Sequence, residues 1–241
     1  MTIKTINKSC IILASILLNG CATNKYVTNH NDPLEPLNRG FYRFNKTLDT
    51  LYLKPASKTY ELILPQALRE LINNFFANIG EIPTIANSLL QAKFSQVGNS
   101  TARFAINSTL GIGGLFDVAT KANLPRQKED FGTTLATWGY KDSHYLVLPI
   151  LGPSTIRDGI GTIGNTFLSP PYYLKPNWRN RYEFAYMVDK RSDLKEAQSF
   201  VENMGIDEYK SQRDAYLQNR DYKINNKQSS SNKTLLDEPP E

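Results

Sequence analysis

The stretch N-S-T-L-G-I-G-G-L-F-D-V-A, from Asn107 to Ala119, holds three glycines within four positions and surrounds them with apolar residues. A packed helix avoids so much glycine, and a loop that faces water is normally polar. Glycine backbone can also bend sharply or approach other groups closely. Two readings remain open: a tight turn buried between helices, or a flexible apolar element that faces lipid or lines a lipid path.

Helical periodicity dominates the sequence before this stretch. Asp32 is the expected N-cap of a first helix, with Pro33 as its first helical residue. Apolar residues then recur at steps of three and four, which predicts one stripe of an amphipathic helix. The stripe consists of Leu34, Leu37, Phe41, Phe44, Leu48 and Leu51.

Further helices are expected at Pro55, Pro65 and Pro83, and over Asn99–Thr109 after a break at Gly98. The helix after Pro65 has a broad aromatic face that either packs in a core or meets acyl chains. In the helix that ends at Thr109, the predicted apolar positions are Ala102, Ala105, Ile106 and Leu110.

The sequence after the glycine-rich stretch is first irregular. Glu129–Tyr140 carries β-branched and aromatic residues without clean alternation, and Tyr145–Asp158 is apolar but interrupted by prolines. Proline cannot donate a ladder hydrogen bond, so we expect Tyr145–Asp158 to lie outside the interior of any sheet. It is read as an irregular Gly/Pro-rich apolar segment, after which Ser154 or Thr155 could cap a helix.

Helical patterning returns over Asn177–Tyr222, with breaks near Ser192 and Gly205 and with Asp207 as the expected N-cap of the last helix. Residues 223–241 are polar and predicted to be disordered. The sequence therefore predicts a mainly α fold with one helical domain over residues 32–222.

The amino terminus has the pattern of an exported protein. Residues 1–20 carry two lysines and a nine-residue apolar run, which suits a signal peptide and is too short to span a bilayer. L-N-G-C, ending at Cys21, resembles the lipobox of bacterial lipoproteins, although an ordinary signal peptide with a chance cysteine is the alternative. We expect lipidation of Cys21, a tether over residues 21–31 and, because Ala22 follows, sorting to the outer membrane.

Composition excludes several classes of function. Removal of residues 1–20 takes away two lysines and no acid, so the net charge falls from +5 to a mild +3 that argues little for nucleic acid. The histidines are His30 and His144, no metal-ligand spacing occurs, and no G-x-S-x-G motif follows a strand pattern. We expect neither an enzyme nor a cofactor or metal.

Four motifs in order resemble the VacJ/MlaA lipoprotein family. They are D-P-L-E-P-L-N-R with F-x-x-F-N downstream, the glycine-rich stretch, E-D-F-G-T-T-L with W-G, and L-V-L-P-I-L-G-P-S-T-I-R-D. The resemblance covers about residues 20–222. The sequence departs from the family pattern at Asn19 and at residues 141–144.

The resemblance implies an outer-membrane lipoprotein that maintains lipid asymmetry. It implies a helical ring around an amphipathic pore on the periplasmic side, which extracts phospholipids misplaced in the outer leaflet. These would pass to a soluble periplasmic carrier of the Mla pathway for retrograde transport to the inner membrane, and trimeric porins would be partners. A structural lipoprotein that associates with porins but transports nothing is the alternative.

Candidate residues of the lipid path combine the apolar glycine-rich stretch with charges set in apolar sequence. The charges could instead form structural ion pairs or caps. The candidates are Gly111, Gly113, Gly114, Leu115, Phe116, Asp117, Arg157 and Asp158.

Overall fold

The computed structural model describes residues 32–203 and 207–226, and most of them are helical. The elements before the glycine-rich stretch are α2 (Glu35–Leu48), η1 (Asp49–Leu53), α3 (Lys54–Ile63), α4 (Gln66–Ile79), α5 (Glu81–Leu90) and α6 (Phe94–Thr109). Those after it are α7 (Val118–Lys121), α8 (Phe131–Thr137), β1 (Tyr145–Leu148), β2 (Gly152–Thr155), α9 (Ile156–Leu168), η2 (Pro170–Tyr173), α10 (Pro176–Asp193), α11 (Lys195–Asn203), α12 (Glu208–Asp221) and η3 (Tyr222–Asn226). The predicted mainly α, single-domain fold is confirmed.

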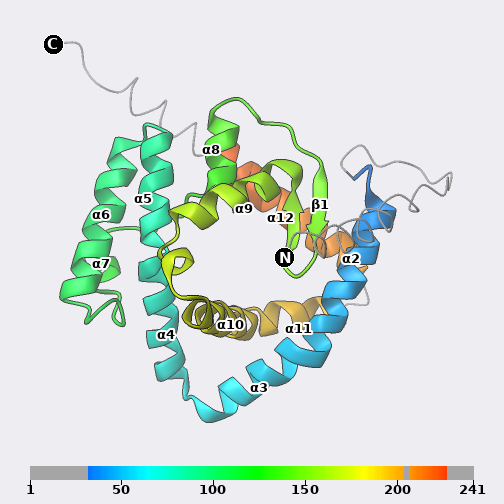
Figure 1. The fold of residues 1–241 in the computed structure, drawn as a ribbon, viewed down its shortest axis with the longest axis horizontal. Coiled ribbons are helices and arrows are strands. Elements are labelled where there is room, and N and C mark those ends of the chain that lie inside the picture. Colours follow the sequence, from blue (N-terminus) through cyan, green and yellow to red (C-terminus); the bar gives the residue numbers. More distant parts are fainter. Residues whose placement is uncertain (1–31, 204–206, 227–241) are drawn as a thin grey trace, which may run out of the picture.

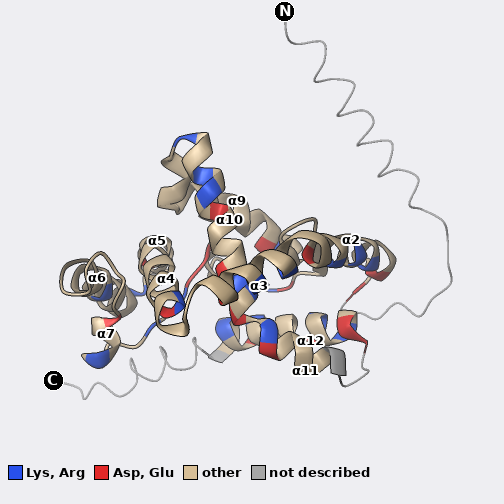
Figure 2. Cartoon of the chain, turned by 90° about the horizontal axis from the view of Figure 1, so that it is seen from below, with Lys and Arg blue, Asp and Glu red and all other residues tan. Residues whose placement is uncertain are grey.

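The helices are arranged around a central region that no ribbon crosses (Figure 1). Helices α4 and α5 border it on one side, α10 and α11 below, and α9 with the β1–β2 hairpin above, while α6 and α7 lie outside α5. Seen from the edge, α11 and α12 lie together on one side of the layer that contains α2 to α6 (Figure 2). This arrangement is consistent with the predicted ring.

Several predictions fall outside the described residues. The signal peptide, Cys21 and the tether are among them, as is most of the predicted tail. The described chain continues as the helical turn η3 to Asn226, so regular structure extends past residue 222, where we placed the end of the domain. Within the part that the structure describes, no helix combines the length and the hydrophobicity needed to cross a membrane.

Burial is inverted relative to an ordinary water-soluble domain. Among the described residues, buried polar and charged side chains outnumber buried apolar ones by about three to one. Helix α6 illustrates this, because its buried residues are Ser100, Arg103 and Asn107. The apolar positions predicted for this helix are not its buried face: none of them is buried, and Leu110 at its end is 71% exposed. The predicted break at Gly98 is also wrong, since this glycine lies inside α6.

The first helix begins later than predicted, and Asp32 does not cap it. Helix α2 starts at Glu35 without a side-chain cap. Asp32 is instead buried, where its carboxylate accepts hydrogen bonds from Asn38 Nδ2 at 2.8 Å and from the Tyr209 hydroxyl. A residue with the chemistry of an N-cap thus joins α2 to α12. The two other caps were predicted correctly, because Thr155 caps α9 and Asp207 caps α12.

The segment predicted as an irregular return contains a β-hairpin. Strand β1 pairs antiparallel with β2, and Val147 lies opposite Pro153. The prolines do keep the segment out of a sheet interior, because in a two-stranded sheet both strands are edges and an edge tolerates proline. The reading of the segment as irregular is wrong. Residues 129–140, for which no regular element was assigned, contain α8, where Asp130 completes a capping box with Thr133.

Two asparagines of α2 fix the hairpin to the helix. Asn38 donates to Tyr145 O and accepts from Val147 N at 2.9 Å, so its buried amide replaces a missing neighbouring strand. Asn45 donates to Leu148 O at 2.9 Å and accepts from Ile150 N at 2.7 Å. Ile150 has a φ of 68°, which a β-branched residue rarely adopts, so the turn depends on this support.

We expect Asn45→Ala to weaken the hairpin turn by about 1–2 kcal/mol, because both hydrogen bonds to the turn are lost. Chemical denaturation measures the loss, and faster amide exchange at Ile150 locates it. Asn219→Ala is the matched control, since Asn219 is an exposed asparagine of α12. An equal effect of the two substitutions would contradict this role for Asn45.

Candidate functional site

The glycine-rich stretch forms a tight turn that follows α6 directly. Gly113 N donates to Ser108 O at 3.0 Å, and Gly114 N donates to Asn107 O at 2.8 Å. Within the stretch, Gly111 and Gly114 are buried. The side chains of Ile112 and Phe116 are nevertheless 66% and 47% exposed. The stretch therefore has features of both readings, with a buried backbone turn and exposed apolar side chains.

The three glycines have different surroundings. A Cβ on Gly111 would lie 2.3 Å from Phe116 O, and one on Gly114 would lie 2.6 Å from the Asn78 side chain. Gly113 has a φ of 68° but no heavy atom within 4 Å of such a Cβ. Gly111 is required for space, Gly113 for backbone conformation and Gly114 for both.

Gly111→Ala should destabilise the protein much more than Gly113→Ala. The first change forces a methyl group into backbone atoms, which costs about 1–3 kcal/mol or more. The second adds only the strain of a left-handed conformation, about 1 kcal/mol. Thermal or urea unfolding of the two variants tests this order. Equal losses, or a larger loss for Gly113→Ala, would contradict it.

The charge in this stretch, Asp117, belongs to a buried network centred on Arg103. Arg103 Nε lies 2.9 Å from a carboxylate oxygen of Glu81, and Nη2 lies 3.0 Å from Asp117. Its Nη1 donates to Thr120 and to Leu124 O at 2.6 Å. Arg103 is 1% exposed, so one guanidinium joins α5, α6, α7 and the loop after α7.

The electrostatics of Asp117 follow from its partners. Partial burial alone would raise its pKa, but hydrogen bonds led by those from Thr120 and Asn107 lower the pKa to about 2. Asp117 also caps α7 by accepting from Thr120 N. The structural alternative considered for this residue, an ion pair or cap, therefore describes its contacts.

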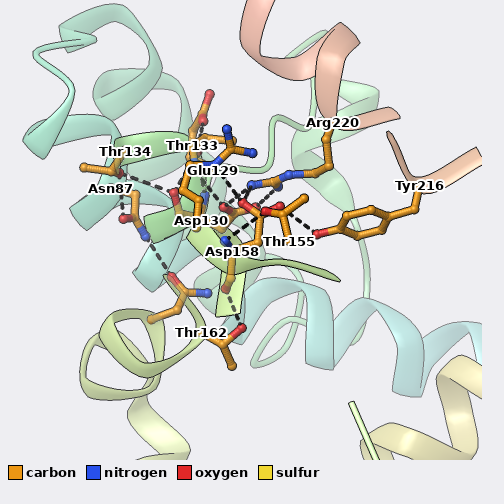
Figure 3. A network of polar contacts seen from close by, with 12 residues as sticks. Asn87, Glu129, Asp130, Thr133, Thr134, Thr155, Asp158, Thr162, Tyr216 and Arg220 are labelled. Carbon is orange, nitrogen blue, oxygen red and sulfur yellow. Dashed lines mark hydrogen bonds and ion pairs between the residues drawn. The ribbon is translucent and has the colours of Figure 1, made fainter. Parts of the chain in front are cut away.

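A second network joins α8, α9 and α12 (Figure 3). Arg220 lies 2.6 Å from Asp130 and 2.5 Å from Asp158, and the Tyr216 hydroxyl donates to Asp158 at 2.7 Å. Burial alone would raise the pKa of Asp158, but Arg220 and the other donors hold it below the usual range. Arg157 Nε lies 3.1 Å from Asp158 and its Nη1 donates to Lys141 O.

Amides and hydroxyls extend this network towards α5 (Figure 3). Thr133 donates to the buried carboxylate of Glu129 at 2.8 Å, and Thr134 donates to Asn87 at 2.9 Å. Asn87 in turn donates to Asn165 of α9 at 2.9 Å. Helices α5, α8 and α9 are thus joined by polar side chains where a soluble protein would use apolar ones.

The structure places the predicted path residues in two separate groups. The glycines, Leu115, Phe116 and Asp117 lie around the turn and the Arg103 network. Arg157 and Asp158 contact each other and belong to the Arg220 network. No hydrogen bond or ion pair among the described residues joins Asp117 to either of them.

Sequence reasoning missed the two arginines at the network centres. A signal was present for Arg103, because it lies three residues after Ser100 and four before Asn107, which marks a polar helical stripe. No local signal was available for Arg220, whose partners lie 62 and 90 residues earlier in the chain.

Comparisons with known proteins agree with one another. The profile of the MlaA lipoprotein family matches residues 30–223. The MlaA lipoprotein of the intermembrane phospholipid transport system of Escherichia coli K12 is 31% identical over 223 residues, covering 90% of this chain and 88% of that protein. An uncharacterised protein of Rickettsia felis is 41% identical over 147 residues, and the match spans only 59% of its length and 61% of this chain.

A solved structure from work on how bacterial outer-membrane lipid asymmetry is maintained has the same fold. Its TM-score to this chain is 0.70 at 31% identity. The match covers 80% of this chain and 99% of that one.

Proposed function

This chain belongs to the MlaA lipoprotein family, as its four motifs predicted, and from that premise we propose that it maintains lipid asymmetry in the outer membrane. It extracts phospholipids misplaced in the outer leaflet. It passes them, chemically unchanged, to a soluble periplasmic carrier for return to the inner membrane. Trimeric porins of the outer membrane are its proposed partners.

The main support for this proposal is that polar side chains are buried and large apolar side chains are exposed. Large apolar side chains are exposed on many of the helices, and examples are Leu62 at 86%, Phe94 at 70% and Ile163 at 64%. Exposed apolar surface on this scale marks contact with lipid or with another protein. Amphipathic helices of this kind lie in the membrane interface with their apolar faces towards acyl chains.

The exposed apolar side chains suit the acyl chains of a phospholipid, and the polar interior suits its headgroup. A phospholipid headgroup loses water when it leaves the membrane surface, and it needs polar partners along its way. Helices α5, α8 and α9 offer amides and hydroxyls where they meet, and Asp158 of α9 is paired with Arg220 of α12. Transport along such a path requires no covalent step.

Incubation of the purified, detergent-solubilised protein with labelled phosphatidylethanolamine tests this function against its alternatives. The expected result is intact lipid that elutes with the protein and is then transferred to acceptor vesicles. Recovery of lysolipid or free fatty acid would instead indicate an enzyme. Absence of bound lipid would favour a structural lipoprotein.

Lipidation of Cys21 is the proposed anchor. We expect Cys21→Ala to release the mature protein from the outer membrane, because several acyl chains together hold a protein stably at about 0.8 kcal/mol per buried methylene. Membrane fractionation measures the release, and Cys10→Ala is the control because that cysteine lies within the predicted signal peptide. An unmodified Cys21 in the mass spectrum of the wild-type protein would refute the anchor.

A further inference from the structure

A recess lies where the loop between α7 and α8 passes α4, α5 and α10. Its volume is about 260 Å³, and its wall combines Phe76 and Tyr186 with the cations Arg126, Lys128 and Lys190. The ring centroids of Phe76 and Tyr186 are 5.4 Å apart, and the rings meet edge to face. One side of the recess is therefore apolar and another is cationic. Complete ligands of drug size usually occupy about 300–1,000 Å³, so the recess suits one part of a lipid, its headgroup.

Two of the cations are available to a ligand. Among the described residues, neither Arg126 nor Lys128 has a carboxylate within ion-pair distance, whereas Lys190 pairs with Asp193 at 3.0 Å. Both side chains are accessible to solvent. Desolvation by the surrounding protein nevertheless lowers the pKa of each. The Arg126 and Lys128 side chains are thus surrounded by protein but still in contact with water. This is the environment of residues that line a recess, not of residues on an outer surface.

The acidic group of the wall is buried and paired with Arg103, which it shares with Asp117. Glu81 is the carboxylate among the lining residues that the structure describes, and it is 2% exposed. Arg103 Nε holds one of its oxygens at 2.9 Å. The two carboxylates nearest to Lys128 along the chain are those of Glu129, which lies 3.3 Å from Lys93, and of Asp130, which is bound by Arg220. Arg126 and Lys128 therefore keep donors that an anion can use.

We propose that this recess binds the phosphodiester of a phospholipid, with Arg126 and Lys128 as its donors and the Phe76–Tyr186 wall beside the glycerol end. The proposal rests on the transport function and names the subsite at which that function recognises its substrate. A guanidinium and an ammonium together suit a phosphate oxygen pair, because charge-assisted hydrogen bonds are the strong ones. Free inorganic phosphate shares this chemistry, so the test separates the two sources.

The test compares three ligands on the full-length protein in mild detergent. They are short-chain phosphatidylglycerol, diacylglycerol with the same acyl chains, and inorganic phosphate. Arg126→Gln/Lys128→Gln should weaken phosphatidylglycerol binding roughly tenfold or more, since two charged donors are lost. Its affinity for diacylglycerol should not change. Lys121→Gln/Lys141→Gln removes the same charge from exposed sites outside the recess and should leave all affinities unchanged.

Arg126→Lys/Lys128→Arg keeps both charges and should restore most of the affinity. Equal weakening of phosphatidylglycerol and diacylglycerol would overturn the proposal, because the residues would then act through the fold. Tight binding of inorganic phosphate that lipid does not displace would also overturn it. A wild-type protein that binds neither lipid would refute the transport function itself, whereas normal lipid binding by the double variant refutes only this subsite.

Discussion

Arg103→Met should lower the free energy of unfolding by about 3–5 kcal/mol, the largest loss expected from a single substitution in α6. The substitution leaves the buried carboxylate of Glu81 and the capping carboxylate of Asp117 without their cation. Methionine fills similar space and favours a helix, so loss of charge pairing causes most of the effect. Urea denaturation monitored by circular dichroism measures it.

Two further variants separate pairing from packing. Arg43→Met removes an exposed arginine of α2 and should change stability by less than about 0.5 kcal/mol. Adding Glu81→Gln and Asp117→Asn to Arg103→Met should recover part of the loss, because no unpaired charge then stays buried. Stability of Arg103→Met within 1 kcal/mol of wild type would show that α5, α6 and α7 do not depend on this network.

Arg220→Gln should be nearly as damaging near neutral pH, and its effect should shrink as the pH falls. Arg220 bridges Asp130 and Asp158, and its loss costs about 3–5 kcal/mol. Burial alone would raise the pKa of Asp130, but the hydrogen bond from Arg220 lowers it. A carboxylate with a lowered folded pKa contributes stability above its unfolded pKa, about 3.9, and loses it as the pH falls through the folded value.

Without Arg220, the folded pKa of Asp130 and of Asp158 rises towards or above the unfolded value, so these groups no longer lose stability as the pH falls. The wild type does lose it, so the free energies of unfolding of Arg220→Gln and of the wild type should differ most near pH 7 and converge towards pH 2. Lys210→Gln on the exposed side of α12 should match the wild type throughout. Denaturant unfolding curves recorded between pH 2 and pH 7 measure the difference, and a difference that does not change with pH would mean that Arg220 does not hold these carboxylates ionised.

Local chemistry in the sequence predicted helices and caps well. Asp207 and Thr155 were identified as caps because a capping side chain acts on backbone amides within its own helical turn. Asp32 has the same chemistry, yet it binds Asn38 and Tyr209. The partner that decides its role lies 177 residues away, so no local pattern could reveal it.

The direction in which each helix faces was not predictable by the usual rule. Amphipathic periodicity locates an apolar stripe but assumes that the stripe packs inward. In α6 the polar stripe is buried, and the apolar residue Leu110 at its end is exposed. Asp117 and Asp158 were candidates for the lipid path because they are charges set in apolar sequence, and in the structure each is paired with a buried arginine.

The distribution of phosphatidylethanolamine between the two leaflets of the outer membrane tests the central claim most directly. An amine-reactive reagent that does not cross membranes labels only the lipid exposed at the cell surface. Cells that lack this chain should show more labelled phosphatidylethanolamine, and restoring the wild-type chain, but not Cys21→Ala, should return the labelling to its original level. Unchanged surface labelling in cells that lack the chain would contradict a role in lipid asymmetry.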